Sequence, residues 1–167
     1  KEELNKVIEP YRTTIGIIGA SNVGRNLIRL LKQFEVKILV YDPYLTEDSE
    51  RDLGVEKVSL EKVMSFSDVV SLHAPATEQT KNMINKENLK LMKDGSIFIN
   101  TSRGSIVNEN DLIEELKKGR IIACLDVTDS EPPSLDSPLR NLPNVVLTPH
   151  IAGAVANNRY RNGSYAI

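Results

Sequence analysis

The chain has 167 residues, of which 40% are hydrophobic and 26% are charged, and its formal net charge is −2 at pH 7. That length suffices for one domain with a core of its own. The chain lacks the basic excess of nucleic-acid-binding proteins and any apolar run of about 18 residues, so we expect neither nucleic-acid nor membrane partners. The single cysteine, Cys124, excludes an internal disulfide and is typical of a reducing compartment, which predicts a cytoplasmic protein.

Short apolar runs alternate with segments of helical period along most of the chain. The runs predict strands at 14–19, 37–41, 69–73, 96–100, 121–126 and 145–148. The helical periods predict helices at 23–32, 60–64, 85–92 and 108–118. In the first of these helices the expected buried face consists of Val23, Leu27, Leu30 and Leu31. The stretch 128–143, which is rich in Pro, Ser and Asp, is expected to be a loop.

Continuous apolar strands separated by helices are typical of βαβ units. Such units build a parallel sheet that is covered on both faces. We therefore expect an α/β protein with a doubly wound parallel sheet of the Rossmann type and helices on both faces.

The segment GIIGASNVG, residues 16–24, joins the first strand to the first helix and differs at one position from the fingerprint G-x-G-x-x-G. Gly19 and Gly24 take the first and third glycine positions, and Ser21 takes the second. Because a helix N-terminus offers free N–H groups, this turn predicts a pyrophosphate site. The Cβ of Ser21 either pushes the pyrophosphate outward, or its hydroxyl compensates with a hydrogen bond, and the sequence leaves both readings open.

Asp42 ends the second predicted strand, 23 residues after Gly19. An acidic side chain at that place accepts hydrogen bonds from the ribose of a dinucleotide and repels a 2′-phosphate. Asp42 therefore predicts NAD rather than NADP as the cofactor. The alternative is that it only begins a turn before Pro43.

Four further motifs follow later strands: SLHAPAT (71–77), INTSRGSIVNENDL (99–112), LDVTDSEPP (125–133) and LTPHIAGA (147–154). Together with GIIGASNVG and VYDP, this ordered set resembles the D-isomer-specific 2-hydroxyacid dehydrogenases. The resemblance covers about residues 14–154. It implies an NAD-dependent oxidoreductase that transfers a hydride between NAD and a small D-2-hydroxy or 2-keto acid.

The resemblance also implies three catalytic residues. Arg103 would hold the substrate carboxylate, because its planar guanidinium suits bidentate binding. His150 would exchange a proton with the substrate oxygen, and Glu131 would orient the imidazole and favour its charged form. Thr128 stands where the family often has a bulkier residue, which affects the expected packing beside the substrate.

The remaining implied contacts are to the cofactor, and no metal is expected. Asp126 would lie on the nicotinamide side, and His73 would lie beside the cofactor without acid–base work. The full implied set is Gly19, Ser21, Asn22, Val23, Gly24, Asp42, His73, Ala74, Pro75, Thr101, Ser102, Arg103, Asp126, His150, Ala152 and Gly153.

Family members are about twice as long as this chain, so we expect the substrate domain to be largely absent from it. Residues 1–13 would be the tail of an inter-domain helix or linker, 14–153 the NAD-binding domain, and 154–167 the start of a crossover. The chain alone should then have little or no turnover, and analogy suggests a homodimer through the coenzyme domain. The alternatives are an NAD-dependent binding module of the corepressor type, without turnover, and a scaffold that has lost the nucleotide.

Overall fold

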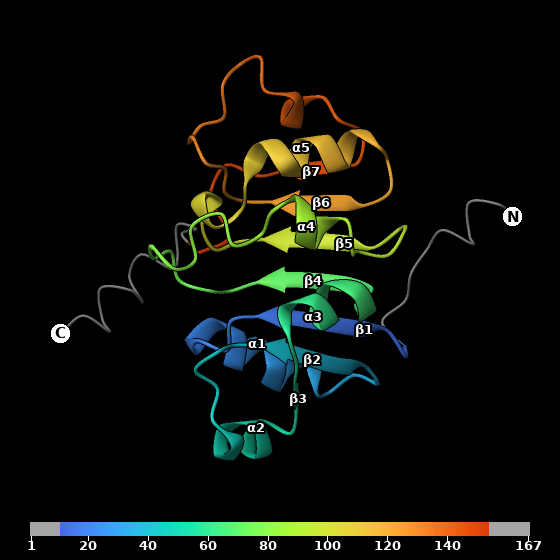
Figure 1. Cartoon of the computed structure of the whole chain (residues 1–167), viewed down its shortest axis with the longest axis vertical. Helices are drawn as coiled ribbons and strands as arrows, with labels where there is room; N and C mark the ends of the chain where they lie inside the picture. The colour runs from blue at the N-terminus through green and yellow to red at the C-terminus, as the bar shows by residue number, and fades with distance from the viewer. Residues whose placement is uncertain (1–10, 154–167) are drawn as a thin grey trace, which may run out of the picture.

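The computed structural model describes residues 11–153 of the chain. In that part, seven parallel strands form one sheet in the order β3-β2-β1-β4-β5-β6-β7, stacked from bottom to top in Figure 1. The expected crossover at 154–167 and most of the expected linker at 1–13 lie outside the described residues.

The six predicted strands are confirmed, and a seventh is added. Their bounds are β1 Thr14–Ile18, β2 Lys37–Tyr41, β3 Glu56–Lys57, β4 Val69–Leu72, β5 Ile97–Asn100, β6 Ile122–Leu125 and β7 Val145–Leu147. The unpredicted strand, β3, has two residues and pairs with β2 at the edge of the sheet. Two residues are too few to produce a periodic signal in the sequence.

The four predicted helices are also present, together with one that was not predicted. The helices are α1 Asn22–Leu31, α2 Glu47–Leu53, α3 Leu60–Phe66, α4 Lys86–Leu89 and α5 Glu109–Lys117, with short 3₁₀ turns η2 Gly104–Ile106 and η3 Pro138–Arg140. The helix that the sequence analysis missed is α2, and α4 is shorter than the expected 85–92. None of the described helices is long and apolar enough to cross a membrane.

Two clusters of buried side chains lie on the two faces of the sheet, and the smaller one covers its face only at β1 and β2. Neighbouring residues of β1 face opposite ways, so Ile17 belongs to one cluster and Ile18 to the other. Ile28 of α1 and Leu53 of α2 pack on the Ile17 side, whereas α3, α4 and α5 pack on the Ile18 side. The result is the three-layer arrangement expected for a doubly wound sheet.

The predicted buried face of α1 is wrong in part. Val23 and Leu30 are 62% and 60% exposed, whereas Gly24 and Ile28 are buried. The reason is Gly24, where a Cβ would lie only 2.1 Å from the carbonyl oxygen of Gly19. This close approach fixes the rotation of α1 and turns Gly24 and Ile28 toward the sheet.

The strand order changes direction at β1, which pairs with β2 on one side and with β4 on the other. In open α/β sheets, ligands bind outside the carboxyl ends of the strands at such a switch point. The loops that follow β1, β2, β4, β5, β6 and β7 leave from this same edge because all the strands are parallel, and they carry the predicted site residues.

Candidate active site

The loop between β1 and α1 depends on glycine at two points. Gly19 has φ 95°, and a Cβ there would lie 2.6 Å from the backbone nitrogen of Ala74. At Gly24 the corresponding contact is with the Gly19 carbonyl oxygen, at 2.1 Å. The loop therefore lies directly against the end of β4, and any side chain at either position would force it away.

The N-terminus of α1 is free to bind an anion. No side chain caps this helix, and its first turn contains no acidic residue. Ser21, Asn22 and Val23 are all exposed. The first N–H groups of a helix have no acceptor within it and carry a partial positive charge, so this end suits a phosphate group.

Ser21 is directed at the end of β4. Its hydroxyl donates a hydrogen bond of 3.0 Å to the carbonyl oxygen of His73. A hydroxyl has one proton to donate. The proton that could reach a phosphate is therefore engaged within the protein, and the side chain ties the loop to β4.

Asp42 organises the backbone around a cleft of about 330 Å³ at the ends of β1, β2 and β4. Its Oδ2 accepts from the Ala20 N–H at 2.7 Å, and its Oδ1 accepts from the Tyr44 N–H at 2.8 Å. The Tyr44 hydroxyl donates to Oε1 of Gln79 at 2.9 Å, which links two loops that line the cleft. Tyr44 and Gln79 could not be predicted from the sequence, because their pairing joins loops 35 residues apart.

His73 lies half-buried at the end of β4, beside the glycine loop. Burial lowers its pKa below the ordinary value for histidine. Its Nε2 lies 2.9 Å from the Ser71 hydroxyl. Burial thus favours the neutral form of the ring, and the absence of an acid–base role for His73 stays a prediction.

The turn after β5 is fixed by hydrogen bonds to its backbone. Asn100 donates from Nδ2 to the Arg103 carbonyl at 3.0 Å, and its Oδ1 accepts from the Ser102 N–H at 3.0 Å. The Ser102 hydroxyl donates to the carbonyl of Ala74 at 2.5 Å. Thr101 is exposed at the same edge. This turn thus joins the ends of β4 and β5 and leaves the Arg103 side chain at the surface.

Arg103 itself is exposed, and its guanidinium donates to the Ser102 carbonyl at 2.6 Å. Within residues 11–153, no hydrogen bond or ion pair joins it to Glu131 or His150. The structure therefore brings two of the three predicted catalytic residues together and leaves the third on the neighbouring loop.

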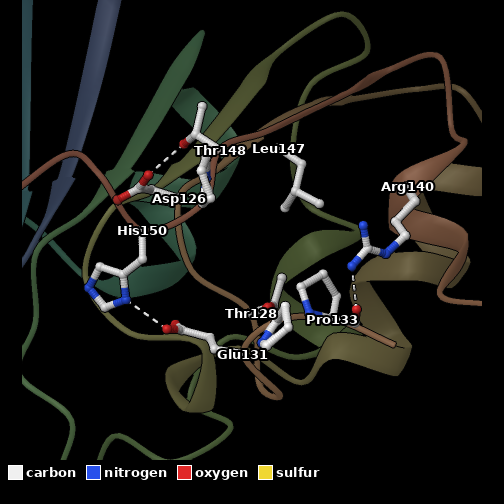
Figure 2. Close-up of a pocket in the computed structure, with 10 residues that line it drawn as sticks. Asp126, Thr128, Glu131, Pro133, Arg140, Leu147, Thr148 and His150 are labelled. Carbon is white, nitrogen blue, oxygen red and sulfur yellow. Dashed lines mark hydrogen bonds and ion pairs between the residues drawn. The ribbon is translucent and has the colours of Figure 1, made fainter. Parts of the chain in front are cut away.

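Glu131 and His150 form an ion pair between the loops that follow β6 and β7. Nδ1 of His150 lies 2.6 Å from Oε2 of Glu131, with 46% and 38% of the two side chains exposed (Figure 2). An ionised carboxylate only accepts hydrogen bonds, so Nδ1 carries the proton in this pair. Nε2 is then the nitrogen left for a ligand.

The backbone at His150 is strained, and Asp126 holds it in place. His150 has φ 53°, a left-handed conformation that is uncommon for residues other than glycine. Asp126 accepts from the Thr148 hydroxyl at 2.5 Å and from the N–H groups of Ile151 and Ala152 at 2.9 and 2.8 Å. The His150 N–H also donates to the Asp126 carbonyl at 3.0 Å.

Asp126 stays ionised in this setting. Its burial acts to raise the pKa, but the hydrogen bonds from Thr148, Ala152 and Ile151 and the nearby His150 outweigh burial and lower the pKa below its usual value. Its three donors account for the turn that presents His150, and Thr148 is a residue of that turn which the sequence analysis did not single out.

The ion pair lies on the wall of a cavity of about 450 Å³ (Figure 2). Thr128, which stands where the family often has a bulkier residue, is buried on the same wall. Its hydroxyl donates to the Ser130 carbonyl at 2.7 Å. At another part of the wall, Arg140 donates to the carbonyls of Pro133 and Ser134 at 2.6 and 2.9 Å. Arg140 was not predicted as a lining residue, because the sequence of 128–143 indicates only a loop.

A second cavity, of about 280 Å³, adjoins the first at Asp126. Thr101, Cys124 and Ala152 are among its other lining residues. Burial raises the pKa of the Cys124 thiol, so this cysteine is a poor nucleophile. Gly153, the last residue that the structure describes, is exposed. Among the described residues, no group of histidine, cysteine or acidic side chains is arranged to hold a metal ion.

Comparison with known sequences gives a family match over most of the chain. Residues 1–152 match the family described as "D-isomer specific 2-hydroxyacid dehydrogenase, NAD binding domain". The chain is 47% identical over 152 residues to a glyoxylate reductase of Korarchaeum cryptofilum, and 42% identical over 153 residues to a hydroxypyruvate reductase of Thermotoga maritima. Each alignment covers 90% of this chain but only 46% and 49% of those proteins. The chain thus spans about half the length of these curated relatives.

Solved structures give the same result. The NAD-complexed D-isomer specific 2-hydroxyacid dehydrogenase of Lactobacillus delbrueckii ssp. bulgaricus is 30% identical, with a TM-score of 0.80 over 90% of this chain and 50% of that one. The apo D-mandelate dehydrogenase of Rhodotorula graminis is also 30% identical, with a TM-score of 0.86 over 98% of this chain and 48% of that one.

Proposed function

Because the chain belongs to the D-isomer specific 2-hydroxyacid dehydrogenases, as their NAD-binding domain, we propose that it serves an enzyme that interconverts a small D-2-hydroxy acid and its 2-keto acid. NAD is the cofactor of this domain. The observation that carries the proposed chemistry is the Glu131–His150 ion pair of 2.6 Å at the carboxyl edge of the sheet. The relatives are oxidoreductases by name, and nothing in the comparisons supports a corepressor-type module.

The described residues fit both the adenosine end and the nicotinamide end of NAD. The pyrophosphate would lie at the uncapped N-terminus of α1, close to the glycine loop. The adenosine would enter the cleft of about 330 Å³, with its ribose at Asp42. The nicotinamide would lie toward Thr101, Asp126 and Ala152, which line the cavity of about 280 Å³.

In the proposed mechanism, the chemistry that the cofactor would supply is hydride transfer, from NADH during reduction of the keto acid and to NAD⁺ during oxidation of the hydroxy acid. The Arg103 guanidinium binds the substrate carboxylate and polarises the neighbouring carbonyl. Nε2 of His150 donates a proton to the carbonyl oxygen during reduction and takes it back during oxidation. Glu131 holds the ring through Nδ1 and stabilises its charged form.

Calorimetric titration of the chain with NAD and with NADP tests the cofactor assignment. We expect NAD to bind in preference to NADP, and Asp42→Asn to narrow that preference by about tenfold, or ~1.4 kcal/mol, since the repulsion of the 2′-phosphate is lost. Asp52→Asn is the matched control, because Asp52 is an exposed carboxylate on α2, on the same side of the sheet. Equal affinity of the unaltered chain for the two cofactors would contradict the role given to Asp42.

Turnover tests the catalytic assignment in a protein that carries this chain together with a substrate domain. We expect NADH-dependent reduction of glyoxylate or hydroxypyruvate, the class of substrate that the names of the relatives indicate. His150→Gln should lower kcat by about 10²–10⁴-fold because the general acid is lost. An unchanged kcat in that variant would refute the assignment of His150.

The proposal extends to the organisation of the whole protein. Residues 14–153 would be the coenzyme domain, flanked by a linker at 1–13 and by a crossover to the substrate domain at 154–167. The resemblance to the family supports a homodimer through the coenzyme domain, and the lone Cys124 supports a cytoplasmic location. Sedimentation equilibrium of the full protein tests the dimer, and a monomer at micromolar concentration would refute it.

A further inference from the structure

The Glu131 side chain belongs to an exposed part of the loop that follows β6. Asp129, Ser130 and Glu131 are all exposed. The other partner of the ion pair, His150, is fixed by its own turn and by Asp126. A carboxylate on an unrestrained loop would not stay 2.6 Å from a fixed ring without losing considerable entropy, so some group must restrain this loop.

The start of α5 packs against that loop. The Glu109 carboxylate, at the first position of α5, accepts from the Asp129 N–H at 2.9 Å. Asp129 precedes Glu131 by two residues. The contact thus restrains the backbone directly before the carboxylate that holds His150, and it joins segments that are 20 residues apart.

The loop has other restraints besides Glu109. After Glu131, Arg140 donates to the carbonyls of Pro133 and Ser134. Before Glu131, two further features restrain it. A Cβ at Gly104, in η2, would lie 2.0 Å from the Thr128 carbonyl carbon, so η2 and the loop are in direct backbone contact. The Thr128 hydroxyl closes a turn onto the Ser130 carbonyl at 2.7 Å. The same Cβ would also lie 2.5 Å from the Asp129 nitrogen, so η2 packs against that group as well. Neither feature gives the Asp129 N–H a hydrogen-bond acceptor, and Glu109 supplies it.

We propose that Glu109 is a positioning residue, which holds the backbone at Asp129 so that Glu131 stays in contact with Nδ1 of His150. The inference rests on the proposed function, because it gives Glu109 a part in presenting the proposed proton donor. The proposed role of Glu109 depends on an acceptor oxygen placed opposite the Asp129 N–H, and not only on the negative charge of the side chain. A hydrogen bond to a backbone N–H fixes both distance and direction.

Proton NMR of the 167-residue chain at neutral pH, without cofactor or substrate, tests this inference. The Nδ1–H of His150, held at 2.6 Å from a carboxylate, should give a resolved downfield resonance, which Glu131→Gln identifies by abolishing it. Glu109→Ala should cause loss of the same resonance, because the loop is released. Glu109→Gln should retain it, because the amide oxygen still accepts from Asp129. Asn110→Ala is the matched control, since Asn110 is an exposed neighbour in α5 and lines, with Glu109 and Asp129, a surface cleft of about 300 Å³.

Each outcome bears on Glu109 alone. Loss in Glu109→Ala with retention in Glu109→Gln and Asn110→Ala supports the inference, provided that the backbone amide spectrum of β1 and β4 is unchanged. Retention in Glu109→Ala overturns it. Loss in both Glu109 variants also overturns it, since charge and not the acceptor would then be responsible. Failure of the proposed function would appear separately, as an absence of cofactor binding or turnover in the unaltered protein.

Discussion

Asp126 is only 5% exposed, and its carboxylate accepts three hydrogen bonds from the turn that presents His150. The motif LDVTDSEPP predicts that this aspartate is a site residue, and we propose that it lies near the nicotinamide. Its internal contacts could not be predicted, because the donors belong to residues 148, 151 and 152, which the fold alone brings back to the end of β6. A motif can thus predict a site residue without revealing the hydrogen-bond partners of its side chain.

Asp126→Asn should destabilise the protein strongly. The amide would keep one acceptor oxygen but would direct an NH₂ group at a backbone N–H, so we expect a loss of about 2–4 kcal/mol in the free energy of unfolding. Urea denaturation measures it. Asp129→Asn, on an exposed side chain, is the control and should change stability by no more than about 0.5 kcal/mol. A small effect in Asp126→Asn would mean that the turn is held by other contacts.

Ser21→Gly addresses the two readings that the sequence left open. The hydroxyl donates to the His73 carbonyl, so the side chain is part of the restraint on the glycine loop. A glycine at this position increases the conformational entropy that the loop must lose on binding NAD, at a cost of roughly 0.5–1 kcal/mol. We therefore expect NAD to bind about two- to fivefold more weakly. Calorimetry of the variant gives the answer. Tighter binding in the glycine variant would favour the steric reading instead.

At the level of elements, the sequence predicts the strands and helices that have a regular pattern of apolar residues and misses those that lack one. The apolar runs predicted six of the seven described strands, and in the structure Asn85 and Asn108 cap α4 and α5. The missed helix, α2, has the sequence EDSERDL, in which only Leu53 is buried, so it has almost no apolar period. Its capping signals were nevertheless present, with Thr46 before an acidic first turn and Gly54 in the left-handed conformation after the last turn.

Because α2 buries so little, its cap should matter. The Thr46 hydroxyl accepts from the Ser49 N–H at 3.2 Å. Thr46→Ala should lower the free energy of unfolding by about 1 kcal/mol, and Thr46→Ser, which keeps the acceptor, should restore most of it. Chemical denaturation of the two variants side by side measures the difference. Equal stability of the two would show that the cap bond contributes nothing here.

For the whole molecule, the parallel sheet explains why the sequence predicts the edge at which the site lies but not the side-chain contacts within the site. Parallel strands bring their carboxyl ends to one edge, so motifs at the ends of predicted strands must lie near one another. Which side chains touch depends on loop conformations that the motifs do not encode. Glu131 and His150 do meet, at 2.6 Å, whereas Arg103 bonds to its neighbour Ser102.

The same molecule should lose stability in acid in two steps. Burial lowers the pKa of His73 from its ordinary 6.5, so the unfolded chain binds the proton more readily than the folded one. The neutral His73 ring therefore contributes to the free energy of unfolding. This contribution is fully present above pH 6.5 and is lost as the pH falls from 6.5 toward the lowered pKa of the folded protein. The second step, at lower pH, comes from the carboxylates of Asp68, Glu115 and Asp126. Burial acts to raise the pKa of each, but hydrogen bonds and nearby cations outweigh burial and lower the pKa from its ordinary 3.8 or 4.5. Their stabilisation is present above these ordinary values and is lost as the pH falls through the lowered ones.

Urea unfolding at a series of pH values between 8 and 3 should resolve the two steps. His73→Gln is the informative variant, because its side chain does not titrate: the decline that begins near pH 6.5 should disappear, while the decline below about pH 4.5 should remain. Lys93→Met should weaken only the second step, since its ammonium group pairs with Asp68 at 2.8 Å. If His73→Gln kept the full decline near pH 6.5, then burial of His73 would not be its cause, and another group that titrates there would have to be sought.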